Sequence, residues 1–355
     1  MIISEEYGKL PNGEVAMMYT IVNKHGNRLS LTNYGGRILS LTIKDKIGDY
    51  RDVVLGYDDI DGYVSDKHWM GAILGINVGN SVSNGTVQDG ITVFVSDNLD
   101  QQEKKQDSIT LYDELFDCTI MGQENQETIV LQKVVQTPQG RLKVTLSYSF
   151  DDLNNLSVQE DLESDINLEC NLIQQLYLNL NGQGFIDGHT ALINSKYASS
   201  TNGGWTASEF LPVEGRVNLN TAKSLKNLGG SKHKAIKSAG GIDLIYQLDI
   251  PKDDVGKPFK VGRVRARQSA IKVELTTTKP NVYFYTANRF DNIQGKKNTK
   301  ISYTQPDNNF DNVNAKKAGV YNKHSGFVLS PATVSNVVPA NIPQSNTSVY
   351  RFVVR

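Results

Sequence analysis

A strict alternation of apolar and polar side chains constrains the fold of this chain most strongly. Between Leu142 and Phe150, five apolar residues alternate with four polar ones. A period of two places successive side chains on opposite faces of an extended strand. The segment is therefore predicted to be a strand with one buried face and one exposed face.

Several other segments carry the same strand signature. Residues 128–135 predict a strand, and the turn at 137–140 combines a proline, which fixes φ, with a glycine, which permits a positive φ. The two strands are therefore expected to form a hairpin. Further strands are predicted at 270–276, 282–286 and 348–354. Helix is predicted only as single turns, at 58–63 and 113–116.

The spacing of these segments predicts the fold class. Short strands separated by Gly, Asn and Asp favour an all-β fold, a large antiparallel β-sandwich with very little helix, over alternating strands and helices. Three polar stretches, at 96–108, 223–241 and 288–314, are predicted to be loops. None has the composition of a linker, so residues 1–355 are predicted to form one domain.

Charge and cysteine content limit the classes of partner that the chain is expected to bind. The 37 basic and 38 acidic residues give no field that favours nucleic acid or an anionic membrane, whereas a neutral sugar fits. Cys118 and Cys170 form no metal motif and no disulfide framework. No run approaches the roughly 20 apolar residues of a membrane helix, and Glu5 and Glu6 interrupt any signal-like start. A cytoplasmic protein of unspecified oligomeric state is expected.

Six motif segments occur in a fixed order along the chain. The most specific is Arg-Asp-Val-Val-Leu-Gly-Tyr-Asp at 51–58, and the others lie at 31–38, 188–215, 277–288, 324–329 and 350–352. Together they resemble the galactose mutarotase (aldose 1-epimerase) family. The resemblance implies a galactose mutarotase-like supersandwich that acts on aldohexoses without a cofactor or metal.

Mutarotation requires two titratable groups, one on each side of the sugar C1 atom. A base takes the proton of the anomeric hydroxyl, and an acid protonates the ring oxygen. In the family that the chain resembles, a glutamate is the base and a histidine is the acid. A second histidine, an arginine and an aspartate position the sugar hydroxyls.

The resemblance places few of these groups in this chain. Ser330 stands at the glutamate position, and a serine hydroxyl is too weak a base near pH 7. Gly182 stands at the acid histidine when the family segment N-H-S/T-Y-F is aligned with residues 181–185. Asp243 retains the aspartate.

The remaining two groups are also replaced. Residues 75–82 resemble the arginine segment G-R-x-x-N-R-I, but Ile76 and Ser81 stand where the arginines would be. Ile76 cannot offer the guanidinium fork that binds neighbouring hydroxyls. No histidine occurs between His68 and His189, so the second histidine is missing as well. One expected polar group of five survives, which predicts strongly reduced or absent mutarotase activity.

The surviving polar and aromatic residues suggest a sugar site. Asp243 can accept hydrogen bonds from sugar hydroxyls, and the amides of Asn80, Asn181 and Gln183 can donate and accept them. The ring of Trp205 can stack on a sugar face. Asp243 and Trp205 also have a purely structural interpretation, for example a strand-end cap at Asp243, and the three amides cannot act as acid or base.

Three functions follow as alternatives. The chain can be an epimerase with a rearranged site, in which Asp243 works with His324. It can be a carbohydrate-binding or regulatory protein that kept the cleft and lost the chemistry. It can also be a structural or interaction protein whose cleft is closed by Ile76 and Tyr112.

Overall fold

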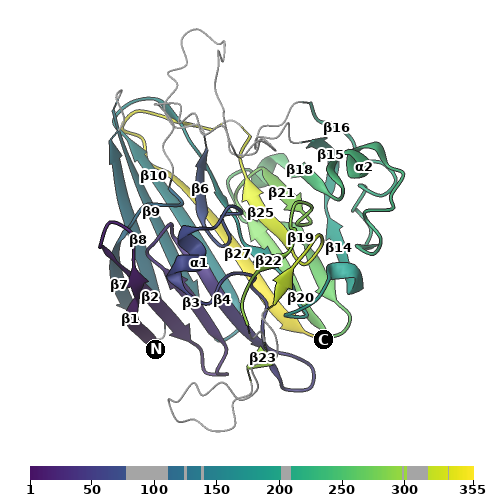
Figure 1. The fold of residues 1–355 in the computed structure, drawn as a ribbon. Helices are drawn as coiled ribbons and strands as arrows, with labels where there is room; N and C mark the ends of the chain where they lie inside the picture. The colour runs from purple at the N-terminus through teal and green to yellow at the C-terminus, as the bar shows by residue number, and fades with distance from the viewer. Residues whose placement is uncertain are drawn as a thin grey trace.

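The structure is a computed structural model that describes residues 1–76, 111–123, 126–136, 140–200, 209–297, 300–301, 319–334 and 336–355. Within these residues, antiparallel sheets dominate and helices are few and short, which confirms the predicted all-β fold class (Figure 1). Asn80, Trp205, the stretch 96–108 and most of the turn at 137–140 lie outside the described residues.

A nine-stranded antiparallel sheet forms one layer. Its strands, in spatial order, are β17 (Lys223–Ser224), β14 (His189–Ile193), β19 (Phe259–Ala266), β20 (Ile271–Thr277), β27 (Gln344–Val354), β10 (Asn155–Ser164), β9 (Arg141–Phe150), β8 (Gln126–Gln136) and β7 (Asp117–Gln123). In β9 the alternating apolar side chains, from Leu142 to Tyr148, are fully buried. β8 and β9 pair antiparallel, as the sequence predicts for a hairpin.

Two six-stranded sheets face this layer. The first contains β1 (Ile2–Lys9), β2 (Val15–Val22), β3 (Arg28–Thr32), β4 (Arg37–Lys44), β5 (Tyr50–Asp52) and β23 (Lys300–Ile301). The second contains β13 (Tyr177–Leu178), β25 (Phe327–Ala332), β21 (Asn281–Tyr285), β18 (Asp243–Leu248), β15 (Ser195–Ser200) and β16 (Leu211–Pro212). The described strands also form three short pairs, which are β11 (Leu168–Glu169) with β26 (Val337–Val338), β12 (Asn171–Gln174) with β6 (Ile73–Ile76), and β22 (Ile293–Gln294) with β24 (Val320–Tyr321).

The helices only partly match the sequence expectations. The turn predicted at 58–63 is α1 (Ile60–Val64), which begins where the Asp59 carboxylate accepts a hydrogen bond from the Gly62 amide. The turn predicted at 113–116 is wrong, because Leu115 instead bridges Tyr34. The predicted loop at 223–241 contains a short helix, α2 (Lys234–Ala239). Two 3₁₀ turns complete the described helices, η1 (Ile186–Gly188) and η2 (Lys252–Asp254).

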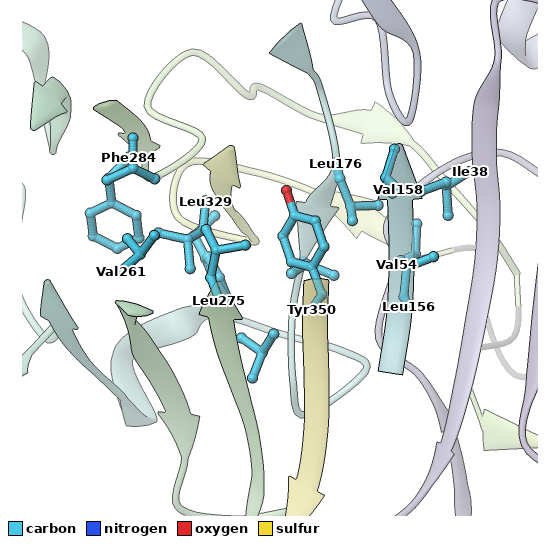
Figure 2. Packing of buried hydrophobic residues seen from close by; sticks show 14 of the residues in the cluster. Ile38, Val54, Leu156, Val158, Leu176, Val261, Leu275, Phe284, Leu329 and Tyr350 are labelled. Atoms are coloured by element: carbon cyan, nitrogen blue, oxygen red, sulfur yellow. The ribbon is translucent and has the colours of Figure 1, made fainter. Parts of the chain in front are cut away.

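The intersheet core is the apolar layer between the nine-stranded sheet and the two smaller sheets. Figure 2 labels members that come from both layers: Ile38, Val54, Leu156, Val158, Leu176, Val261, Leu275, Phe284, Leu329 and Tyr350. Burial of one such side chain contributes roughly 1.5–3 kcal/mol to folding. This core fixes the inward faces of β18, β21 and β25, so their alternate side chains point to the opposite side.

Among the residues that the structure describes, four ion pairs are buried. Because an ion pair removed from water is stable only with good geometry and further hydrogen bonds, these pairs anchor specific backbone segments. The pairs are Arg37–Asp66, Arg51–Asp45, Lys279–Glu160 and Lys296–Asp52, at 3.3, 2.6, 2.5 and 2.6 Å.

Candidate functional site

Three neighbouring strands gather the candidate residues on one sheet face. Asp243 in β18 pairs with Tyr285 in β21, and Tyr283 in β21 pairs with Ser330 in β25. Residues directly opposite each other in an antiparallel sheet project to the same face. Since Phe284 points into the intersheet core, Asp243 and the two tyrosines project away from it. The strand register thereby brings the family aspartate and glutamate positions together on what we call the Asp243 face.

The Asp243 carboxylate is held by a tyrosine and an arginine. The Tyr283 hydroxyl donates to Oδ1 at 2.9 Å, and Nη2 of Arg289 lies 3.7 Å from Oδ2. Asp243 is 9% exposed. Burial, and secondarily the negative charge of Asp243, raise the pKa of Tyr283 well above its usual value. The phenol therefore stays protonated and donates a charge-assisted hydrogen bond.

Aromatic rings surround this carboxylate. We call Tyr177, Tyr283, Tyr285, Phe290 and Tyr321 the aromatic cluster. Tyr283 stacks on Tyr285 at a centroid distance of 5.9 Å, and Tyr177 meets Tyr285 edge-on at 6.2 Å. Phe290 lies 4.7 Å from Tyr177 and 6.4 Å from Tyr321. These spacings are typical of favourable aromatic pairs. All five rings are at most 5% exposed, so they form a buried, largely apolar cluster that contains protonated phenols.

Gln175 adds an amide next to the aromatic cluster. It lies between β12 and β13, and its Nε2 donates to the Tyr177 hydroxyl at 3.0 Å. Its Oε1 is buried and has no hydrogen-bond partner among the described residues. A buried carbonyl oxygen without a donor is costly, so this acceptor is available to a ligand hydroxyl.

His68 is a histidine that the structure brings to this region. Its ring meets Phe290 edge-on at 4.9 Å, and its backbone amide donates to Asp66. Burial is the main cause that lowers the pKa of His68; the negative charge of Asp66 opposes this effect, and the positive charge of Arg289 adds to it. The imidazole is therefore neutral near pH 7, close to the same arginine that contacts Asp243.

Ser330 offers no base at the family glutamate position. Its side chain is buried, and the hydroxyl makes a long 3.5 Å contact with the carbonyl of Pro331. The hydroxyl cannot carry the negative charge that proton abstraction from an anomeric hydroxyl requires.

His324 is tied to a different group. Its Nδ1 lies 3.1 Å from the carbonyl of Thr286 and therefore carries the proton, and its Nε2 is buried without a partner among the described residues. Burial lowers the pKa of His324, and the nearest charged influences are Asp187 and Lys323. A working pair of His324 with Asp243 stays a prediction.

The segment 181–185 forms a turn after β13. Gly182 adopts a φ of 75°, the left-handed conformation that suits glycine. The Asn181 side chain accepts from the Ser269 amide, and its carbonyl accepts from Arg51. Gln183 is exposed. Sugar-binding roles for Asn181 and Gln183 stay predictions, because their surroundings differ from those of Asp243.

Sequence reasoning missed two residues of this site. Tyr283 occupies the Q position of the family segment T-T-x-P-G-x-Q-x-Y-T-G-N, so the signal was present in the motif. Gln175 lies in residues 174–178, where Tyr177 matches the tyrosine of N-H-S/T-Y-F. This second alignment was overlooked because Asn181 and Phe185 match the first and last residues of the same family segment.

Two negative findings concern the described part of the chain. No group of three His, Cys, Asp or Glu side chains there is arranged to hold a metal ion. No helix there is long and apolar enough to cross a membrane.

The fold and the Asp243 face define a large β-sandwich of the galactose mutarotase-like class. Residues 17–333 match the Aldose 1-epimerase family, and the chain belongs to that family. Galactose mutarotase of Homo sapiens is 27% identical over 329 residues, which cover 91% of this chain and 87% of the human protein. Aldose 1-epimerase of Escherichia coli is 22% identical over 298 residues, which cover 81% and 83% of the two chains.

Solved structures support the fold. The aldose epimerase homologue from C. elegans aligns with a TM-score of 0.71 at 17% identity and covers 95% of this chain and 98% of its own. Galactose 1-epimerase from Lactobacillus acidophilus aligns with a TM-score of 0.72 at 14% identity, and the coverage is 99% and 98%.

Proposed function

We propose that this chain binds an aldohexose on the Asp243 face and has strongly reduced or no mutarotase activity. The observation that carries the proposal is the 2.9 Å hydrogen bond from Tyr283 to Asp243 beside a serine at the family glutamate position. The Asp243 carboxylate can still accept a hydrogen bond from a sugar hydroxyl, but Ser330 cannot replace the glutamate as the base.

Sugar binding follows from the chemistry of the face. A pyranose presents hydroxyls at its edge and C–H groups on its faces. Asp243 and the free Oε1 of Gln175 are acceptors for hydroxyls, and the neighbouring buried rings of Tyr177 and Tyr285 make the surroundings apolar. Arg289 contributes a donor on the more exposed side of Asp243. Names of the relatives, galactose mutarotase and aldose 1-epimerase, support the same substrate class.

Loss of catalysis follows from two replacements. We assign the acid histidine position to Gln175 rather than Gly182, because Gln175 contacts Tyr177 and Gly182 forms a backbone turn. A neutral amide can hold a ring oxygen but cannot protonate it. Loss of either the base or the acid costs about 10²–10⁴-fold in rate, and both are absent here.

A slow epimerase is a second candidate, favoured by the position of His68. Its neutral ring lies against Phe290 and feels the charge of Arg289, which contacts Asp243. His68 and Asp243 could then share the proton transfers that the family assigns to histidine and glutamate.

Calorimetric titration with D-galactose and D-glucose tests the proposal. The unmodified protein should bind at least one sugar, and Asp243→Asn should bind it at least tenfold more weakly. Asp253→Asn, in the exposed η2 turn, is the matched control and should change the affinity less than twofold. Absence of binding to either sugar would favour a structural protein with a closed cleft.

The proposal includes the domain organisation and the cellular location of the chain. We propose that residues 1–355 form one domain, supported by the intersheet core, whose members run from Tyr19 to Phe352. A cytoplasmic location is supported by Cys118 and Cys170, which are both free thiols, as is usual in reducing compartments.

A further inference from the structure

The outer face of the nine-stranded sheet carries a small cationic cavity of about 250 Å³. Among its described lining residues four are basic and none is acidic. Arg263 and Arg265 come from β19, Lys272 comes from β20, and Arg355 follows β27. Thr190 of β14 adds a hydroxyl. Figure 1 shows β14, β19 and β20 side by side near the C-terminus.

This cavity is separate from the Asp243 face. Along β19, Arg263 and Arg265 are exposed, and Val264 between them is buried in the intersheet core. Along β18, Leu244 belongs to the same core, and Asp243 projects to the other side. Two sheets and the core between them therefore lie between the two places.

The register of the strands pairs one cation of the cavity with a second cation and another with a carboxylate. Arg265 stands directly opposite Lys272, and like charges directly opposite each other destabilise a sheet. The chain as a whole has 37 basic and 38 acidic residues, so a basic composition does not explain the cluster. Nη2 of Arg265 also donates to the main-chain oxygen of Arg355 at 2.8 Å, which holds both residues at the cavity.

One neighbouring carboxylate only partly offsets these cations. Glu274 lies 2.8 Å from the Lys272 ammonium and 3.7 Å from that of Lys260. The hydrogen bond from Lys272 is the main cause that lowers the pKa of Glu274, so this acid is fully ionised. Arg263 stands directly opposite Glu274, so the same carboxylate also offsets part of its charge, and Arg265 is held by the main-chain oxygen of Arg355. An excess of positive charge remains at the cavity.

We propose that this cavity binds a phosphate group, either free or as the monoester of a small metabolite. Two arginine forks and a lysine match the oxygens of a phosphate, and guanidinium groups bind it through paired hydrogen bonds. Ligand pockets for larger molecules usually span about 300–1,000 Å³, so the volume here suits a small ligand. The cations converge on one cavity instead of following a stripe, which disfavours an extended polyanion.

Calorimetry and ³¹P NMR with two probes test this site. Inorganic phosphate and glucose 6-phosphate distinguish the free ion from the monoester, and D-glucose shows any contribution of the Asp243 face. The double variant Arg263→Gln/Arg265→Gln should bind the preferred probe at least tenfold more weakly. Arg267→Gln removes the same charge from an exposed residue just beyond β19 that does not line the cavity, and should change the affinity less than twofold.

Folding of the double variant is checked by its melting temperature. The variant relieves the repulsion between Arg265 and Lys272 but loses the hydrogen bond from Arg265 to Arg355, so its melting temperature should stay close to that of the unmodified protein. Equal phosphate affinity in the double variant and the unmodified protein would overturn the proposal. Binding only to duplex DNA or to phosphatidylserine vesicles, with no binding of either small probe, would overturn it as well.

Discussion

The Tyr283 hydroxyl donates a 2.9 Å hydrogen bond to the carboxylate of Asp243 from a position diagonal to it in the sheet. The bond fixes the carboxylate where β18, β21 and β25 place the family aspartate and glutamate positions on one face. It keeps one carboxylate oxygen occupied and orients the other toward Arg289.

Removal of this donor should weaken both folding and sugar binding. Tyr283→Phe leaves a nearly buried carboxylate short of one hydrogen bond, which costs about 1–3 kcal/mol of unfolding free energy. Urea denaturation measures this cost, and titration with the preferred aldohexose should show weaker affinity. Tyr197→Phe, at an exposed tyrosine, is the control and should leave both quantities unchanged. Unchanged sugar affinity in Tyr283→Phe would argue against the site.

Restoration of the missing chemistry tests the assignment of Gln175. The double variant Gln175→His/Ser330→Glu supplies an acid and a base, and its mutarotation rate should exceed that of either single variant by at least tenfold. The parallel double variant Gly182→His/Ser330→Glu follows the other alignment and should gain nothing. A gain in the Gly182 variant alone would reverse the assignment.

The buried ammonium of Lys296 should be essential for stability. It lies 2.6 Å from Asp52 and donates to the carbonyls of Leu39 and Val54. Lys296→Met leaves a buried carboxylate without its cation and should cost about 3–5 kcal/mol of unfolding free energy. The neighbouring Lys297 is exposed, so Lys297→Met should cost less than about 0.5 kcal/mol. Similar losses in the two variants would contradict a structural role for the ion pair.

Stability should fall in mild acid because of His189. Burial lowers the pKa of His189 to about 4, and its Nε2 accepts from the Leu180 amide. The unfolded chain binds a proton near pH 6.5 and the folded chain does not. The contribution of His189 is therefore complete above pH 6.5 and is lost as the pH falls toward 4, by about 3 kcal/mol in total.

The variant His189→Gln isolates this contribution. The difference in unfolding free energy between the unmodified protein and His189→Gln should shrink steadily from pH 7 to pH 4. Urea denaturation at several pH values measures the difference. Parallel pH profiles for the two proteins would show that His189 titrates normally in the fold.

The fold could be anticipated because alternation and motif order are local signals. The alternation from Leu142 to Phe150 predicts β9, and the motif at 277–288 contains β21. The helix α2 was missed, since six residues ended by a glycine resemble a polar loop. The turn at 113–116 was misjudged because Leu115 pairs with Tyr34, a contact between distant segments.

The candidate site was only partly predictable, because it depends on contacts between segments that are distant in the sequence. Asp243 and Ser330 follow from their motifs, and both lie on the Asp243 face. The hydrogen bond of Tyr283, the amide of Gln175 and the ring of His68 depend on which strands become neighbours. A sequence does not reveal such neighbours until the register of the sheet is known.

Polarimetric mutarotation measures whether this chain has lost mutarotase activity. Freshly dissolved α-galactose and α-glucose are followed with the purified protein at high concentration and with a buffer blank. We expect a rate equal to the blank for both sugars, because Ser330 and Gln175 cannot act as base and acid. A rate clearly above the blank that is lost in Asp243→Asn or His68→Gln would contradict this expectation and identify a working epimerase.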